Sequence, residues 1–122
     1  MAIRSFLDLD VYKESFQLSV EIDDLLKKFP PEEKFLLVDQ MKRASRSIPA
    51  LIAEGYSKRE SQKEFKKFLR DALAEANEMM CHLAFAKSRK YINYAYADQL
   101  IRRYDILGKK LTSLREKWIN FK

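Results

Sequence analysis

The sequence predicts an all-α protein, an antiparallel up-down-up-down four-helix bundle that forms a single domain over residues 1–122. Two observations favour this class. The chain contains only two glycines and three prolines, too few to build the turns of an antiparallel sheet. Apolar residues recur at steps of three and four along four long segments joined by short connections, as in helices that share one core. A chain of 122 residues can bury such a core without a metal or a disulfide.

The first helix is expected to have its N-cap at Asp8 or Asp10 and to run to Phe29, because the adjacent Pro30 and Pro31 stop it. Its apolar seam alternates steps of four and three residues. The seam consists of Val11, Ser15, Leu18, Ile22, Leu25 and Phe29. This pattern predicts packing against neighbouring helices.

The second helix is expected to begin at Pro31, where a missing N–H costs nothing, with two glutamates in its first turn. Pro49 lies inside this helix, but the apolar register before it continues after it, so one kinked helix is predicted rather than two. Gly55 is expected to end the helix as a left-handed C-cap after Glu54.

The third helix has two candidate capping boxes, Ser57 with Glu60 and Ser61 with Glu64, and the second directly precedes the apolar run. Its inward stripe consists of Phe65, Phe68, Leu69, Ala72, Leu73, Ala76, Met79, Met80 and Leu83. Asn93 is expected near the N-cap of the fourth helix. The apolar face of that helix consists of Leu100, Tyr104, Leu107, Leu111, Leu114 and Trp118.

Positive charge is concentrated in one stretch of the chain. The net charge is +6, and residues 42–70 contain nine Lys or Arg against three Glu. A basic cluster of this kind favours a polyanionic partner, since neutralising phosphates releases counterions. The candidate nucleic-acid-binding residues are Lys42, Arg43, Arg46, Lys58, Arg59, Lys63, Lys66, Lys67 and Arg70. The fourth helix adds Arg103, Lys110 and Lys117, which recur every seven residues on one face.

No base-reading motif accompanies these residues, and Tyr56 is the one aromatic among them that lies off the expected core stripes. The pattern therefore favours recognition of phosphates or of shape over recognition of base sequence. The same residues could instead form a solvated basic face, or a docking surface for an acidic protein.

Catalytic and metal-binding patterns are weak. The chain has one histidine, His82, whereas di-iron bundles need a Glu-x-x-His pair on each of two helices. Cys81 points about 100° away from His82 on a helix, which argues against a nucleophilic dyad. Glu78 and His82 are expected to hydrogen-bond in a structural or interface role, and Glu54 to be partly buried in an ion pair. We expect no catalytic residue, metal or cofactor; an enzyme using Glu54 or Glu78 is a weaker alternative.

A single cysteine fits a reducing compartment, and the sequence shows neither a signal peptide nor a run of about 18 apolar residues that could span a membrane. The sequence therefore predicts a cytoplasmic protein without a membrane partner. Cys81 and Phe85 lie off the expected core stripe, so we expect at least one of them near a subunit contact.

The region from Arg43 to Leu83 resembles the signature region of bacterial four-helix bundle proteins encoded in intervening sequences of 23S rRNA genes. The matching elements are Arg43-Ala44, Ser47-Ile48-Pro49-Ala50, Ile52-Ala53-Glu54-Gly55-Tyr56, Phe65, Phe68-Leu69-Arg70, Ala72-Leu73, and Glu78 with His82-Leu83. Phe29-Pro30, Glu33 and Gln40 also fit upstream. Among the matched positions we expect a structural role for Pro49, Glu54, Gly55, Glu78 and His82.

The resemblance implies an antiparallel four-helix bundle that assembles as a ring-like homopentamer, and it implies no catalytic activity. Related members, the accessory variability determinants of diversity-generating retroelements, are basic pentamers expected to bind nucleic acid and a reverse transcriptase. We therefore expect a non-enzymatic homo-oligomer that binds RNA or DNA phosphates through the basic faces of its second, third and fourth helices. The alternative is a protein-interaction scaffold or an accessory subunit of a nucleic-acid-processing enzyme, without direct nucleic-acid binding.

Overall fold

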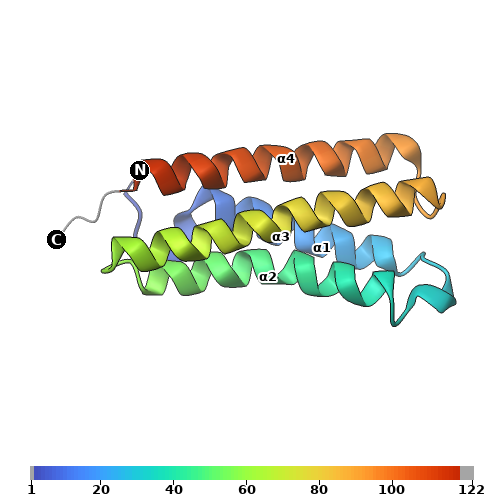
Figure 1. The fold of residues 1–122 in the computed structure, drawn as a ribbon, viewed down its shortest axis with the longest axis horizontal. Helices are drawn as coiled ribbons and strands as arrows, with labels where there is room; N and C mark the ends of the chain where they lie inside the picture. The colour runs from blue at the N-terminus through green and yellow to red at the C-terminus, as the bar shows by residue number, and fades with distance from the viewer. Residues whose placement is uncertain (1, 119–122) are drawn as a thin grey trace.

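The computed structural model describes residues 2–118. Over this range the chain forms four α-helices and no strand: α1 is Asp10–Leu26, α2 is Leu37–Ser57, α3 is Gln62–Ser88 and α4 is Tyr94–Lys117. Successive helices run in opposite directions, so that the start of α1 and the end of α4 lie at the same end of the bundle (Figure 1). The structure confirms the predicted all-α four-helix bundle.

The four helices surround one core. α2 lies along α1 and α3, and α3 lies along α4; of the neighbouring pairs, α1 and α4 have the sparsest contact, and the diagonal pairs α1/α3 and α2/α4 lie farther apart. The largest fully buried side chains are those of Leu18, Ile22, Met41, Ile48, Ile52, Phe65, Leu69, Met79, Leu83, Leu100, Tyr104 and Leu107. Every helix contributes to this set, and the members from α1, α3 and α4 fall on the predicted stripes. None of the helices in residues 2–118 has both the length and the apolar character needed to cross a bilayer.

The predicted start and end of the first helix are wrong by a few residues. Asp8 closes a short 3-10 helix, η1 (Phe6–Asp8), where its carboxylate accepts hydrogen bonds from the backbone N–H groups of Arg4 and Ser5. Asp10 is already the first residue of α1 and follows Leu9 at the N-cap. At the other end α1 stops at Leu26, and a tighter turn returns Phe29 to the core, where it is buried.

The predicted start of the second helix at Pro31 is also wrong. Pro31–Glu33 forms a 3-10 helix, η2, and α2 begins only at Leu37, after Leu36 adopts a non-helical conformation (φ −119°, ψ −105°). The Glu33 carboxylate accepts hydrogen bonds from the Tyr91 hydroxyl at 2.8 Å and from the Leu37 N–H at 3.4 Å. Glu33 therefore ties this connection to the α3–α4 turn instead of lying in the first turn of a long helix.

Gly55 does not end α2. The helix continues without a break through Pro49, as predicted, and also through Gly55 to Ser57, and no described glycine has a positive φ. Gly55 instead lies at a close approach of α2 and α3. A Cβ at this position would be 2.6 Å from the Cβ of Phe68 and 3.1 Å from Cδ1 of Phe65. A glycine is required here for its small size, not for its backbone freedom.

The caps of the last two helices are where the sequence predicted them. The Ser61 hydroxyl accepts a hydrogen bond from the Glu64 N–H at 3.1 Å, which confirms Ser61 as the N-cap of α3. The Ser61 N–H donates to the Lys58 carbonyl at 3.0 Å instead of to Glu64, so the reciprocal half of the predicted box is not formed. Ser57 belongs to α2, and its hydroxyl donates to the Glu54 carbonyl. The Asn93 side chain caps α4 by accepting from the N–H of the third helical residue at 3.1 Å.

Four of the predicted core residues are only partly buried: Leu73, Met80, Leu114 and Trp118.

Candidate nucleic-acid interface

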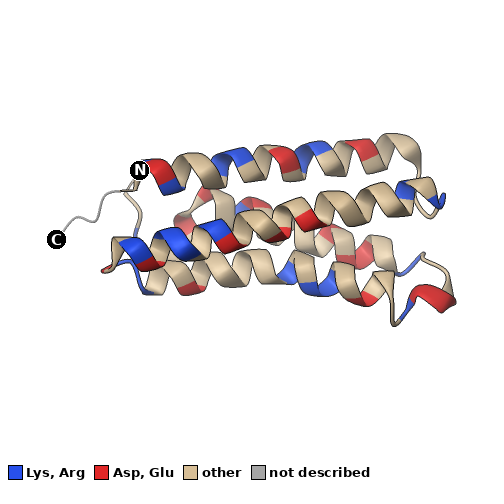
Figure 2. Ribbon diagram, in the orientation of Figure 1, with Lys and Arg blue, Asp and Glu red and all other residues tan. Residues whose placement is uncertain are grey.

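The structure brings basic side chains from two helices together at the end of the bundle where α3 begins and α4 ends. Figure 2 shows blue bands on the first turns of α3, which lie beside the last turns of α4. An open groove of about 450 Å³ lies between them. We call it the basic groove; it is lined by Lys63, Lys66, Lys67 and Arg70 of α3 and by Arg115 and Glu116 of α4.

Helix geometry explains why these residues meet. Positions 63, 66, 67 and 70 are spaced by three and four residues, so they share one face of α3 over an axial length of about 10 Å. On α4, a Cβ built on Gly108 would lie 3.0 Å from Leu73, which fixes the register of the two antiparallel helices. Seven residues further along α4, Arg115 is level with Lys66. Arg115 therefore completes the groove from the opposite wall.

Most of the cations in the basic groove have no ionic partner. Lys63, Lys66, Lys67 and Arg115 form no ion pair with any residue of the described range 2–118. Arg70 Nε is 3.9 Å from Asp71 Oδ1, a weak contact at an exposed site. These charges are therefore free to attract an anion without first breaking an internal pair.

The two basic residues at the end of α2 are partly engaged. Lys58 Nζ is 3.5 Å from Glu54 Oε2 and lies over the ring of Phe68 at 4.8 Å from its centroid. The Arg59 guanidinium stacks over the Tyr56 ring at 4.2 Å and donates to the Tyr56 carbonyl at 3.1 Å. Both side chains border the end of the bundle that carries the basic groove, although neither lines the groove.

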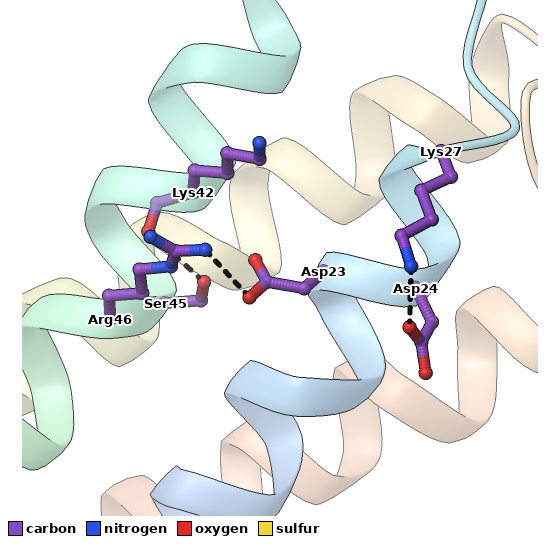
Figure 3. Close-up of polar contacts among 6 residues, drawn as sticks. All are labelled: Asp23, Asp24, Lys27, Lys42, Ser45 and Arg46. Atoms are coloured by element: carbon purple, nitrogen blue, oxygen red, sulfur yellow. Dashed lines mark hydrogen bonds and ion pairs between the residues drawn. The ribbon is translucent and has the colours of Figure 1, made fainter.

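The remaining three candidates, Lys42, Arg43 and Arg46, lie on another part of α2. Arg46 is about 18 Å from Lys58 along the helix axis. Its guanidinium points to α1 and binds Asp23 at 2.8 Å, as Figure 3 shows. Arg43 Nε contacts Asp39 at 3.0 Å. The nine candidate residues therefore form two separate groups, and carboxylates largely neutralise the group around Arg46.

Two basic residues of α4 face α1 instead of an anion site. Arg103 donates to both carboxylate oxygens of Glu21, at 2.9 and 2.6 Å. This bidentate hydrogen bonding lowers the pKa of Glu21 against the opposing effect of its partial burial. Lys110 contacts Asp10 and Glu14, both at 2.9 Å. We call these contacts the α1–α4 seam; of the predicted basic face on α4, Lys117 remains exposed.

The predicted structural residues on α2 and α3 are placed as follows. Glu54 pairs with Lys58, as expected, but its side chain is 55% exposed, so the expected partial burial is wrong. On the helix its side chain points about 100° away from Gly55, the residue that packs against α3. Glu78 and His82 hydrogen-bond at 3.2 Å, which confirms the contact expected from their spacing. Nearby, partial burial raises the pKa of the Glu75 carboxyl.

Sequence reasoning missed Arg115 because its role depends on the register of α3 and α4. The signal that could have found it is the seven-residue step from Gly108, a small residue on an otherwise apolar face, to Arg115. Residues 2–118 contain no group of three or more His, Cys, Asp or Glu side chains arranged to hold a metal ion. The arrangement at the basic groove therefore suits electrostatic binding of an anion.

The fold and the groove define a basic four-helix bundle protein. The chain belongs to the 23S rRNA-intervening sequence protein family, whose model matches residues 7–113. It is also similar to a crystal structure described as a protein with unknown function from the S23 ribosomal protein family, from Bacteroides thetaiotaomicron. The two chains are 29% identical with a TM-score of 0.79, over 88% of this chain and 96% of the other. No curated protein matches the sequence.

Proposed function

We propose that this protein is a non-enzymatic, homo-oligomeric module that binds nucleic acid by contacts between its basic groove and phosphates. The observation that carries the proposal is the convergence of five cations from α3 and α4 on one open groove. Four of the five have no carboxylate partner in the described range, whereas Arg46, Arg103 and Lys110 are paired. An unpaired cation gains a phosphate contact and the accompanying counterion release without losing an internal ion pair.

The family description supports a link to RNA, since it refers to the intervening sequence of a ribosomal RNA. It does not say that the protein contacts that RNA. The basic groove supplies the physical reason to expect contact, and no known base-reading motif accompanies its Lys and Arg residues. We therefore expect affinity that depends on salt and little on sequence.

Exposed apolar side chains support self-association. Phe16 and Val20 on α1 are 51% and 44% exposed. At the end of the bundle away from the basic groove, Phe35 is 83% exposed, and Leu36 and Phe85 are each 61% exposed. Contact with further copies of the chain would remove this apolar surface from water. Each copy would also bring its own basic groove, and several weak phosphate contacts on one nucleic acid would add up to higher avidity.

The candidate catalytic groups are better explained by structural contacts. Glu54 is exposed and paired with Lys58, and His82 is directed to Glu78 on its own helix. Cys81 is a free, exposed cysteine. These contacts support a binding protein over an enzyme.

The test is binding of labelled RNA and DNA to the purified protein across a salt series, with the mass of the assembly measured by light scattering on the same sample. If all five groove cations engage phosphates, the slope of log K against log salt is expected to be about −4.5 on B-form DNA. Affinity should then fall about 500-fold when salt rises from about 50 to about 200 mM. Light scattering should show an oligomer.

A charge-matched pair of variants separates the basic groove from net charge. Replacing Lys63, Lys66, Lys67 and Arg70 by Gln should reduce the slope to about −1. The control variant replaces four exposed cations elsewhere, Lys13, Lys28, Lys34 and Arg102, and has the same net charge. It should keep most of the slope. Equal losses in the two variants would show that the groove has no special role.

An alternative function is that of a protein-interaction scaffold or accessory subunit. The observation that favours it is the apolar turn at Phe35 and Leu36, which lies beside a second groove lined by Cys81, His82 and Phe85. In that case the intact oligomer would bind no nucleic acid at low salt. Phe35→Ser would then weaken binding of a protein partner without changing the mass of the assembly, whereas a fall in that mass would assign the turn to contacts between copies of the chain.

A further inference from the structure

The aromatic residues next to the basic groove face inward. Phe65 is fully buried, and Tyr56 and Phe68 are only 6% and 9% exposed. Tyr56 therefore belongs to the core, although its sequence position placed it off the expected core stripes. Trp118 is half-buried and makes edge-to-face contacts with Phe65, at 4.7 Å between ring centroids, and with Tyr56, at 6.4 Å. These rings hold the ends of α2, α3 and α4 together.

The outer faces of two of these rings are covered by the protein's own cations. The Arg59 guanidinium lies 4.2 Å from the centroid of Tyr56. Lys58 and Lys67 lie over Phe68 at 4.8 and 5.9 Å. Proteins that bind single-stranded nucleic acid combine a basic groove with exposed aromatic faces on which bases stack. Among the described residues around this groove, only the half-buried Trp118 keeps a partly exposed ring, and that ring packs edge-to-face against Phe65 and Tyr56.

The cations are held on rigid helices at fixed spacing. The row from Lys63 to Arg70 is about 10 Å long. Successive phosphates on one strand of a duplex rise by about 3.4 Å along the axis, so a row laid parallel to that axis spans about three such steps. Arg115 adds a contact from the neighbouring helix, whose axis lies about 8–10 Å away. A duplex presents its phosphates already ordered, whereas a single strand loses conformational freedom on binding and would gain no stacking in return.

We propose that the basic groove binds the phosphate backbone of double-stranded nucleic acid and makes no stacking contact with bases. This inference rests on the proposed function and adds the class of nucleic acid to it. Binding is then insensitive to sequence and stronger for a duplex than for either of its strands.

The experiment compares a mixed-sequence DNA duplex of about two helical turns, an RNA duplex of the same sequence, and each separated strand, all at one salt concentration. Both duplexes are expected to bind at least about tenfold more tightly than any single strand, with slopes of log K against log salt near −4.5 for the DNA duplex and −3.5 or shallower for single strands. Trp118 is the only tryptophan, so its fluorescence reports base stacking at this end of the bundle. The emission should not be quenched by single strands.

Single strands that bind as tightly as the duplexes, or that quench Trp118, would overturn the inference and leave the proposed function standing. If neither form binds, the proposed function fails as well. The variant Trp118→Leu keeps every groove cation and provides the control. Its affinity for single strands is expected to stay within about twofold of the unsubstituted protein, whereas loss of a stacked base would lower that affinity about fivefold or more.

Discussion

Replacing Gly55 by alanine tests the close approach of α2 and α3. The new Cβ would be 2.6 Å from the Cβ of Phe68, an atom attached directly to the backbone of α3. Because that atom cannot rotate away, α2 and α3 must separate locally. Overpacking of this kind costs about 1–3 kcal/mol, and the better helix propensity of alanine offsets about 1 kcal/mol of it. Because Phe65 Cδ1 is also only 3.1 Å away, we expect an overpacking cost near the top of that range. After the gain in helix propensity, the net loss of stability is about 2 kcal/mol.

Urea and thermal unfolding followed by circular dichroism, at fixed protein concentration, measure this effect. For a chain of this length a loss of about 2 kcal/mol lowers Tm by about 8 °C. Gly108→Ala is the matched control, since Gly108 is also helical but its added Cβ would meet only the end of the flexible Leu73 side chain, at 3.0 Å. That variant should be neutral or slightly more stable. Equal stability of the two variants would refute the close packing described at Gly55.

Two further predictions concern single contacts. Ser61→Ala is expected to destabilise the protein by about 1 kcal/mol in urea unfolding through loss of the α3 N-cap, whereas Ser57→Ala, which removes no cap, should have little effect. Glu21→Gln should cost about 1 kcal/mol at neutral pH, since it weakens the partly exposed bidentate contact with Arg103. Because the folded-state pKa of Glu21 lies below its ordinary value of 4.5, this contribution is present above that pH and is lost as the pH falls through the folded-state value. The stability difference between the unsubstituted protein and Glu21→Gln should therefore shrink on acidification, and a difference independent of pH would contradict the assignment.

The fold could be predicted from the sequence because each helix carries its own local signals. The apolar stripes mark the core, and Ser61 and Asn93 cap the helices that they precede. The errors occurred where a tertiary contact competes with a local signal. Gly55 suggests a helix end in the sequence, but it is buried against α3 and stays helical. Glu33 suggests the first turn of a helix, but it binds Tyr91, which is distant in the sequence.

The candidate site could be predicted only in part. The row from Lys63 to Arg70 follows from helical spacing alone, and the structure places it on one face. Whether Arg46 is free to bind an anion depends on its ion pair with Asp23 of another helix. The contribution of Arg115 depends on the register of α3 with α4. Neither the partner nor the register is visible in a count of charges. A sequence can therefore reveal that a region is basic without revealing which of its charges are free.

Because charged pairs hold the α1–α4 seam together, ionic strength is expected to affect the stability of the fold as well as the binding of nucleic acid. The seam is the sparsest of the helix contacts, and its charged pairs link the first and last helices across the bundle. Added salt screens exposed pairs such as Lys110 with Asp10 while it also displaces a bound polyanion. Part of any measured salt slope would then report loosening of α1 rather than released counterions. A parallel unfolding series at each salt concentration separates the two contributions.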